Sequence, residues 1–386
     1  MGELDQDLLS IQEARTLASE AFAAWKEWAK ASQEQVDRVC AAMSEAAFGA
    51  AERLGRMAHE ETGYGFPQHK KLKNEFAAKN VWESIRDLKT VGVISADEKR
   101  HIFDIAWPMG VIAALTPSTN PTSTVIYKIL IAVKARDAII IAPHPSAAKC
   151  SYEAAALMAK VAEENGAPHG LISCMRHISL AGSQELMSHK YIALILATGG
   201  TPMVRAAHST GKPAYGVGPG NVPVYVDRSA DLEKAARYIV ASKSFDCSTI
   251  CASEQAVVAD APIAARLMQL MQQEGAYFAT PEETQRLRTL LFHADGAMNT
   301  ATVGKPAVYL AALAGIDVLK DTRVLVCRLQ KVGREEPLSR EKLTTVLGWY
   351  EAAGWEAGCE RCIELIQFGG RGHSLIIHAT DQKVIM

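Results

Sequence analysis

The sequence predicts an α/β protein built on a mostly parallel, doubly wound sheet. Short apolar runs of strand length alternate with helical stretches from residue 109 to about residue 209. A turn of small or polar residues follows each run, as in right-handed crossovers from strand to helix. The chain has 386 residues, 48% of them hydrophobic and 22% charged, which is typical of a globular protein of two or three domains.

Charge and apolar patterning narrow the classes of partner. The formal net charge of −2 provides no broad basic surface, so nucleic acid is not an expected partner. The most apolar stretch, residues 125–143, contains Lys128, Lys134, Arg136 and Asp137, so no membrane span is expected. The acidic N-terminus lacks the layout of a secretory leader, and eight scattered cysteines are therefore expected as reduced thiols of a cytoplasmic protein.

Helices are expected before the sheet begins. Apolar positions at helical spacing predict them within residues 6–60, with one at about 33–51 and another at 53–62. Gly63, Gly65 and Pro67 interrupt the pattern, and a lysine-rich helix is expected from residue 68 to about residue 88. Residues 91–105 predict a β-hairpin with a polar tip, whose unpaired edges would invite a partner subunit.

The alternating series supplies the expected sheet. Strands are predicted at residues 109–115, 138–142, 178–181 and 191–197, and helices at 122–133, after His144 to about 165, from Gly182, and from 201 to about 209. Thr198, Gly199 and Gly200 form the turn best suited to a pyrophosphate, because glycines admit the backbone and a helix N-terminus favours negative charge. The ordinary G-x-G-x-x-G fingerprint is absent, since residues 216–220 contain a proline and precede no helix.

A second series begins at a predicted strand, residues 222–226. Helices are expected at 231–242, 267–273, 284–291 and 355–368, and strands at 255–259, 323–327 and 374–378. Cys251 lies on the connection between the helix at 231–242 and the strand at 255–259. The pattern alone leaves two interpretations, a buried packing thiol or a nucleophile, and favours packing.

A second pair of cysteines, Cys359 and Cys362, lies on a predicted helix. A lone Cys-x-x-Cys lacks the further ligands that a zinc site needs, and no strand-to-helix redox context surrounds it. We interpret the pair as structural, and no metal is expected.

Six short motifs occur in order along the chain. They are Glu-Thr-Gly-Tyr-Gly at residues 61–65, Thr-Asn-Pro-Thr-Ser-Thr at 119–124, Pro-His-Pro at 143–145, Ala-Thr-Gly-Gly at 197–200, Gly-Val-Gly-Pro-Gly-Asn at 216–221 and Ile-Cys-Ala-Ser-Glu-Gln at 250–255. With these motifs the chain resembles the CoA-acylating aldehyde dehydrogenases, in particular the aldehyde dehydrogenase half of the bifunctional aldehyde–alcohol dehydrogenases.

The resemblance implies an aldehyde dehydrogenase-like fold, with two doubly wound Rossmann-type domains and a projecting oligomerisation hairpin. Residues 1–90 and 108–221 would form the NAD-binding domain, residues 91–107 the hairpin, and residues 222–386 the catalytic domain. The chain ends at Met386, so the C-terminal end of the catalytic domain is expected to be incomplete relative to the family.

The resemblance also implies a mechanism. Cys251 would attack an aldehyde, with the Asn120 amide and the Cys251 N–H stabilising the oxyanion. Hydride transfer to the nicotinamide would leave a thioester on Cys251. Coenzyme A would then attack this thioester and leave as acyl-CoA. Hydrolytic relatives activate water with a glutamate where this chain has residues 216–221, which contain no carboxylate. That absence favours coenzyme A over water.

The family correspondence assigns further residues to the cofactor, which is NAD, with NADP as a possibility. They are Thr116, Pro117 and Ser118 near the nicotinamide, His144 and Pro145 near the adenosine ribose, Gly182, Thr198, Gly199 and Gly200 near the adenine and phosphates, Gly218, and Glu341 with Leu343 at the nicotinamide ribose. Two alternatives stay open: Asn120 as a turn residue before a proline, and Glu341 as a helix-start carboxylate.

One departure from the family lies beside the nucleophile. Cys247 stands where relatives usually have asparagine, and it could compete with Cys251 or pair with it under oxidation. We favour Cys251 because it alone lies in the Ile-Cys-Ala-Ser-Glu-Gln motif. The expected substrate is a short-chain aldehyde, either acetaldehyde or sulfoacetaldehyde, and the expected assembly is a homodimer or larger homo-oligomer. A hydrolytic aldehyde dehydrogenase and a catalytically impaired structural paralogue are the alternatives.

Overall fold

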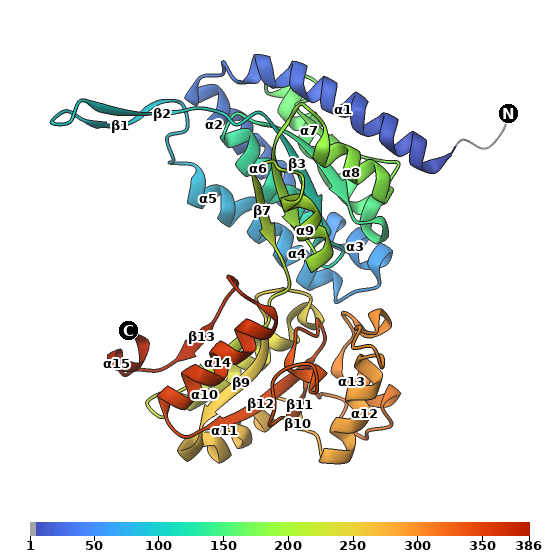
Figure 1. Ribbon diagram of the computed structural model, residues 1–386, viewed down its shortest axis with the longest axis vertical. Helices are drawn as coiled ribbons and strands as arrows, with labels where there is room; N and C mark the ends of the chain where they lie inside the picture. The colour runs from blue at the N-terminus through green and yellow to red at the C-terminus, as the bar shows by residue number, and fades with distance from the viewer. Residues whose placement is uncertain (1–4) are drawn as a thin grey trace. The chain divides into compact units, whose positions relative to one another are not determined.

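The computed structural model describes residues 5–386 and contains two compact units (Figure 1). The first unit extends to Gly63 and resumes at Pro67–Val217, whereas the second comprises Tyr64–Phe66 and Gly218–Met386. Three residues from the N-terminal half of the chain therefore belong to the second unit. Each unit has its own sheet and is described by itself.

The sheet of the first unit is parallel, in the order β5-β4-β3-β6-β7. Its strands are β3 (Val111–Thr116), β4 (Ala138–Pro143), β5 (Ile172–Cys174), β6 (Ile192–Thr198) and β7 (Ala214–Val217). The chain runs outward from β3 to β5 and then crosses back to β6 and β7. The strand order therefore reverses between β3 and β6, and ligands of doubly wound sheets bind past the carboxyl ends of the strands at such a point.

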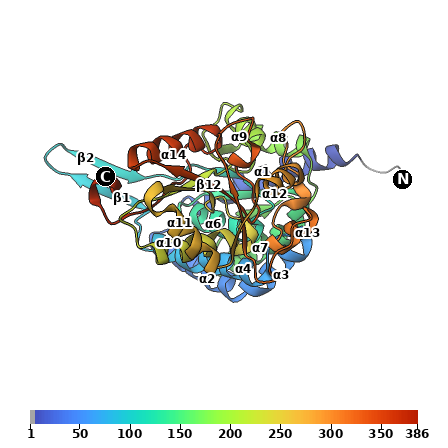
Figure 2. The same ribbon diagram turned by 90° about the horizontal axis from the view of Figure 1, so that it is seen from below.

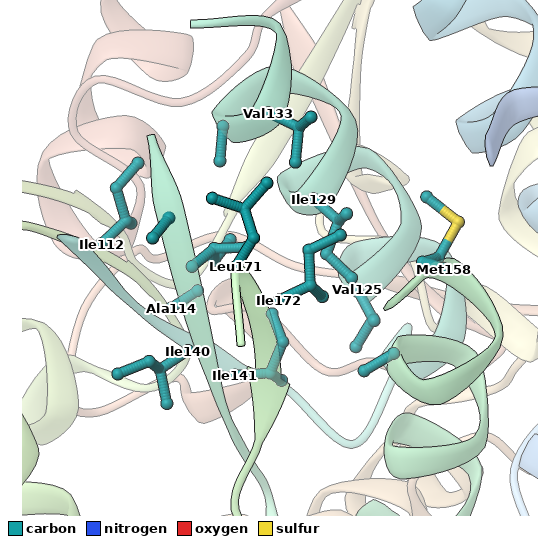
Figure 3. Close-up of a cluster of buried hydrophobic side chains, with 14 of the residues drawn as sticks. Ile112, Ala114, Val125, Ile129, Val133, Ile140, Ile141, Met158, Leu171 and Ile172 are labelled. Atoms are coloured by element: carbon teal, nitrogen blue, oxygen red, sulfur yellow. The ribbon is translucent and has the colours of Figure 1, made fainter. Parts of the chain in front are cut away.

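Helices cover both faces of this sheet. They are α1 (Gln6–Trp28), α2 (Gln33–Gly49), α3 (Ala51–Thr62), α4 (Pro67–Glu75), a π-helical turn (Phe76–Asn80), α5 (Val81–Ile85), α6 (Pro121–Lys134), a 3₁₀ turn (Pro145–Ala147), α7 (Ala148–Glu164), α8 (Leu180–Ser188) and α9 (Thr201–His208). Val125, Ile129 and Val133 recur at helical spacing on α6 and point toward the apolar side chains of β3 to β5 (Figure 3). Each such buried aliphatic side chain stabilises the fold by about 1.5–3 kcal/mol.

A two-stranded hairpin projects from the first unit in both views (Figure 1, Figure 2). Its antiparallel strands are β1 (Gly92–Asp97) and β2 (Ile102–Ala106). Phe103 and Ile105 on β2 are 59% and 62% exposed. Exposed apolar side chains on an open strand pair are suited to contact with another chain.

The sheet of the second unit is also parallel, in the order β10-β11-β12-β9-β8-β13. The strands are β8 (Val222–Val226), β9 (Glu254–Asp260), β10 (Ala276–Phe278), β11 (Val324–Arg328), β12 (Val346–Ala352) and β13 (Ile376–His378). The helices are α10 (Leu232–Ser244), α11 (Ala261–Gln273), α12 (Pro281–Leu291), α13 (Ala307–Leu313), α14 (Trp355–Gly369) and α15 (Gln382–Ile385), with 3₁₀ turns at Phe245–Ser248, Thr300–Thr302 and Pro337–Ser339. One apolar core includes α10 and α11, and a separate core includes α12, α13 and α14.

One predicted strand is wrong. Residues 178–181 lie at the start of α8, which begins at Leu180 rather than at Gly182. The Ser179 hydroxyl accepts a hydrogen bond from the Gly182 N–H at 3.1 Å and caps the helix. The strand of that crossover is instead β5, and the sequence analysis also did not predict β7, β10 or β12. Within residues 5–386, no helix combines the length and apolar character needed to cross a bilayer.

Candidate active site

The connection that carries Cys251 has an unusual backbone. After α10 it makes a 3₁₀ turn, and Asp246, Cys247 and Ser248 have φ values of +47°, +51° and +63°. Non-glycine residues rarely adopt this left-handed region, at a cost of roughly 1–2 kcal/mol each. Cys247 is buried, whereas Cys251 is partly exposed just before β9. Of the two thiols, Cys251 is therefore the one that a substrate can reach.

The Asp246 carboxylate holds this turn in place. It accepts a hydrogen bond from the Phe66 N–H at 2.8 Å and one from the Thr249 hydroxyl at 2.8 Å. Gly65, with φ of +61°, donates its N–H to the Gly304 carbonyl at 2.9 Å. A Cβ on Gly65 would lie 1.8 Å from Asp246 Oδ1, so only glycine fits. The segment Tyr64–Phe66 thus holds the Cys251 connection in place through its contacts with Asp246. We call this segment the clip.

Gly220 joins the Cys251 connection to two further groups. A Cβ on Gly220 would lie 2.0 Å from the Cys251 carbonyl oxygen and 3.0 Å from His373 Cε1. The Gly220 N–H donates to Glu341 Oε1 at 2.9 Å. Cys251, Glu341 and His373 are therefore gathered around one buried glycine in the second unit.

Glu341 is a carboxylate with a raised pKa. Burial raises the pKa of Glu341 to about 7. The hydrogen bond from the Gly220 N–H and the nearby Lys243 and Lys342 act in the opposite direction and lower this pKa. Leu343, two residues later, has a φ of +46°, and its carbonyl accepts from the Gly304 N–H at 2.9 Å. Glu341 precedes β12 by a short loop, so the alternative of a helix-start carboxylate is wrong.

His373 is a site residue that sequence reasoning missed. It follows α14 and is partly buried, and burial lowers the pKa of its imidazole, which is therefore neutral near pH 7. Its Nδ1 lies 3.1 Å from Ser374 Oγ. The local sequence Arg-Gly-His-Ser offered only a glycine turn as a signal.

The predicted nicotinamide turn lies at the carboxyl end of β3, the central strand of the first unit. Thr116 is 4% exposed, and no described residue forms a hydrogen bond with its Oγ1. Pro117 and Ser118 follow it and are partly exposed. An unsatisfied buried hydroxyl beside the point where the strand order reverses fits a polar ligand such as a nicotinamide cofactor.

Asn120 occupies the N-cap position of α6, but its side chain does not cap the helix. Its Oδ1 accepts a hydrogen bond from Lys73 Nζ at 2.7 Å, and its Nδ2 lies 3.2 Å from Thr119 Oγ1. The ammonium fixes the orientation of the amide and draws electron density from it, which strengthens Nδ2 as a donor. Lys73 is 9% exposed and is a second residue that sequence reasoning missed.

Lys128 ties together the two strands at the reversal point. This lysine of α6 is 2% exposed and donates from Nζ to the carbonyls of Leu115 on β3 and Leu196 on β6, at 2.8 and 2.9 Å. Burial lowers its pKa to about 7. In the sequence it only interrupted an apolar stretch, whereas in the structure it joins the two strand ends beside the predicted cofactor turns.

The remaining predicted cofactor residues also belong to the first unit, apart from Gly218. His144 and Pro145 are exposed after β4, and the His144 N–H donates to the Thr116 carbonyl at 3.1 Å. Thr198, Gly199 and Gly200 connect β6 to α9, with Gly200 at the N-cap. Gly182 is buried against α1, where a Cβ would lie 1.8 Å from Ser10 Oγ. Gly218 is partly exposed in the connection to β8.

A family profile matches most of the chain. The profile for the aldehyde dehydrogenase family covers residues 6–281. The chain belongs to the aldehyde dehydrogenase family. Its fold, with parallel sheets of Rossmann type, agrees with that family and confirms the fold class predicted from the sequence.

Relatives within the family are named as acylating enzymes. An acetylating aldehyde dehydrogenase from Geobacillus thermoglucosidasius superposes with a TM-score of 0.96 at 49% identity, over 99% of this chain and 84% of that one. The acetylating succinate-semialdehyde dehydrogenase of Clostridium kluyveri is 36% identical over 98% of this chain and 82% of its own length. These similarities confirm the predicted resemblance to the acylating branch of the aldehyde dehydrogenases.

The bifunctional relatives in the family are longer than this chain. Aldehyde-alcohol dehydrogenase 2 of Entamoeba histolytica is 39% identical over 98% of this chain, but the match covers 45% of that protein. The chain thus spans somewhat less than half the length of these relatives.

Among the described residues, no group of three or more His, Cys, Asp or Glu side chains is arranged to hold a metal ion. Cys359 and Cys362 both lie on α14, the first exposed and the second buried.

Proposed function

We propose that this aldehyde dehydrogenase converts a short-chain aldehyde to its acyl-CoA thioester, using NAD or NADP and coenzyme A, with Cys251 as the nucleophile. The observation that supports this proposal most strongly is the contact between Gly220 and the Cys251 carbonyl. It places Gly220 beside the backbone of Cys251, and the motif that contains Gly220, residues 216–221, has no carboxylate to activate water. A thioester on Cys251 would persist there until a better nucleophile than water arrived.

The Cys251 thiolate adds to the aldehyde carbon, and the Asn120 amide and the Cys251 N–H stabilise the resulting oxyanion. A bound nicotinamide would supply the acceptor for the hydride of that carbon, and loss of the hydride would leave an acyl thioester on Cys251. The coenzyme A thiol attacks the thioester carbonyl, forms the new carbon–sulfur bond and releases the Cys251 thiolate. Neutral His373, beside Gly220, takes the proton of the incoming thiol.

We propose that twelve residues predicted from the sequence bind the cofactor. They are Thr116, Pro117, Ser118, His144, Pro145, Gly182, Thr198, Gly199, Gly200, Gly218, Glu341 and Leu343. The unsatisfied Thr116 hydroxyl and the partly buried Glu341 carboxylate are the groups best suited to bind its polar parts.

Relatives support the choice of coenzyme A. A propionaldehyde dehydrogenase of Rhodopseudomonas palustris, 29% identical with a TM-score of 0.84, has been solved with bound coenzyme A and an acylated cysteine. An engineered glycolyl-CoA reductase, 30% identical, has been solved with bound NADP⁺. We infer the same two ligand classes for this chain.

The aldehyde is short. Relatives are named for succinate semialdehyde, sulfoacetaldehyde and propionaldehyde. We retain acetaldehyde and sulfoacetaldehyde as the two candidates, which a comparison of turnover on acetaldehyde, propionaldehyde and sulfoacetaldehyde would separate. We also propose a cytoplasmic homodimer or larger homo-oligomer, assembled through the exposed apolar side chains of the β1–β2 hairpin.

The test is NADH formation from acetaldehyde with and without coenzyme A. The proposal predicts NADH formation that depends strictly on coenzyme A beyond the first turnover, loss of activity in Cys251→Ala, and retention of most activity in the matched variant Cys247→Ala. NADH formation without a thiol acceptor would indicate a hydrolytic enzyme instead. No NADH from the wild-type chain with any of the three aldehydes would indicate the impaired paralogue.

A further inference from the structure

The N-terminal end of α7 follows directly on the residues proposed to lie near the adenosine ribose. His144 comes just after β4, the 3₁₀ turn Pro145–Ala147 follows it, and α7 begins at Ala148. NADP differs from NAD by a phosphate on the 2′ oxygen of this ribose. The end of a helix is a ready site for such a phosphate, because its first N–H groups have no partner within the helix.

The His144 side of this end provides few free donors. His144 Nδ1 accepts a hydrogen bond from the Ser146 N–H at 3.1 Å, and the His144 carbonyl accepts one from the Ala147 N–H at 2.9 Å. Both N–H groups of the turn are therefore used by the chain itself.

A carboxylate from another helix occupies the first turn of α7. Glu61 lies in the last turn of α3, which packs against α7. Its Oε1 accepts from the Lys149 N–H at 2.9 Å, and its Oε2 accepts from the Cys150 N–H at 2.7 Å. Four of the five backbone N–H groups of residues 146–150 thus have an acceptor within the chain. The negative charge that a helix N-terminus favours is already supplied by Glu61.

The N-terminal end of α9 differs in this respect. Its N-cap residue, Gly200, has no side chain to accept from the first turn, and no acidic residue lies in that turn. The pyrophosphate proposed at residues 198–200 therefore meets no carboxylate in the first turn of α9, whereas a phosphate at the start of α7 would meet Glu61.

We propose that Glu61 makes this chain selective for NAD over NADP, because it occupies the N-terminal end of α7 and repels a 2′-phosphate. This inference rests on the proposed function, in which His144 lies near the adenosine ribose. A phosphate monoester carries roughly −1.5 to −2 charges at pH 7, so a fixed carboxylate beside it is unfavourable. A group that disfavours the wrong ligand gives specificity without adding affinity for the right one.

Lys149 is the cation whose effect Glu61 opposes. Its side chain is exposed on the first turn of α7, and its own N–H is bound by Glu61. Arg53 of α3, by contrast, already pairs with Glu153 of α7 at 3.3 Å. If Glu61 lost its charge, Lys149 would attract a 2′-phosphate without opposition. Neutralisation of Glu61 should therefore strengthen the binding of NADPH.

The experiment measures the Kd values of NADH and NADPH on the full chain by nucleotide fluorescence. The wild-type protein should bind NADH about 100-fold more tightly than NADPH. Glu61→Gln keeps one acceptor oxygen for α7 but removes the charge. It should tighten the binding of NADPH by about tenfold and change that of NADH by less than about twofold.

Two further variants identify the charges involved. Adding Lys149→Met to Glu61→Gln should remove most of the gain for NADPH, and a gain that remained in full would overturn the role given to this pair of charges. The matched control, Glu164→Gln, removes an exposed carboxylate that pairs with Lys160 at the other end of α7, and it should behave as wild type.

A purely structural role of Glu61 predicts a different result. Glu61 also joins α3 to α7, and loss of that contact alone would weaken the binding of both nucleotides by the same factor. An unchanged ratio of the two Kd values in Glu61→Gln would therefore overturn the inference.

Salt tests the repulsion on the wild-type protein, even if Glu61→Gln folds poorly. Because salt screens charges, the ratio of the two Kd values should narrow between about 50 mM and about 500 mM salt. A ratio that stayed constant or widened would also overturn the inference.

The two proposals fail in different ways. Selective NADH binding that depends on Glu61, with no coenzyme A-dependent turnover, would refute the proposed function alone. Coenzyme A-dependent turnover in a chain that binds NADPH as tightly as NADH would refute the role of Glu61 alone. A wild-type chain that binds neither nucleotide would refute both.

Discussion

At the scale of single residues, Cys251 depends on a turn that would be unfavourable alone. Three successive left-handed residues cost roughly 1–2 kcal/mol each. The Asp246 carboxylate offsets part of this through hydrogen bonds from Phe66 and Thr249, and a bond to a charged group contributes about 1.5–3 kcal/mol. The turn therefore keeps Cys247 buried and leaves Cys251 partly exposed.

The contact between Lys73 and Asn120 leads to a prediction about the proposed role of Asn120 as an oxyanion donor. Lys73→Met removes the hydrogen bond to Asn120 Oδ1 and the polarisation of the amide, so kcat should fall by about 10–100-fold. The KM for NAD should change by less than about twofold, because the effect acts on the transition state. Steady-state kinetics with varied NAD and saturating aldehyde and coenzyme A measure both quantities.

Lys71→Met is the matched control, since Lys71 lies on the same helix but has a side chain that is 40% exposed and pairs with Glu52. Equal kcat values in the two variants would mean that Lys73 does not support Asn120.

The sequence motifs predict Cys251 and Asn120 as site residues, but they do not indicate which residues contact them. Lys73 lies 47 residues from Asn120 in the chain, and His373 and the Cys251 carbonyl both lie close to Gly220. Nothing local marks such residues, because their roles come from contacts made after folding.

At the scale of elements, the short segment Tyr64–Phe66 is expected to influence both the stability of the fold and the reactivity of Cys251. Gly65 requires a positive φ and leaves no space for a Cβ beside Asp246. Gly65→Ala should therefore lower the free energy of unfolding by about 1–3 kcal/mol and slow alkylation of Cys251 or change its pH dependence. Urea unfolding and iodoacetamide reactivity measure the two effects.

Gly49→Ala is the comparison, because Gly49 ends α2 with open space around it. This substitution should be neutral or slightly stabilising. If Gly65→Ala were as harmless as Gly49→Ala, the clip would not hold the Cys251 connection.

Most elements followed from periodicity, and the exceptions have physical causes. Residues 178–181 have the apolar composition of a strand, but the Ser179 cap begins a helix there. The sequence analysis made no strand prediction for β12, which contains Gly348 and is buried between the neighbouring strands β11 and β9. Burial between two strands stabilises such a segment more than its intrinsic propensity opposes it.

At the scale of the whole molecule, the chain forms two units, each with its own parallel sheet and its own apolar packing. The first unit contains Asn120 and the turns at the strand ends, and the second contains Cys251, Glu341 and His373. The sequence predicted two doubly wound domains. It did not predict that residues 64–66 belong to the second unit, because that assignment depends on hydrogen bonds to Asp246 and Gly304.

The central claim is that an acyl group rests on Cys251 until coenzyme A removes it. The most direct test incubates the chain with acetaldehyde and NAD without coenzyme A and examines the peptide that contains both Cys247 and Cys251 by fragment mass spectrometry. We predict one acetyl group on Cys251, stable in buffer and discharged as acetyl-CoA when coenzyme A is added. An acetyl group on Cys247, or acetate released at the same rate without coenzyme A, would contradict the account.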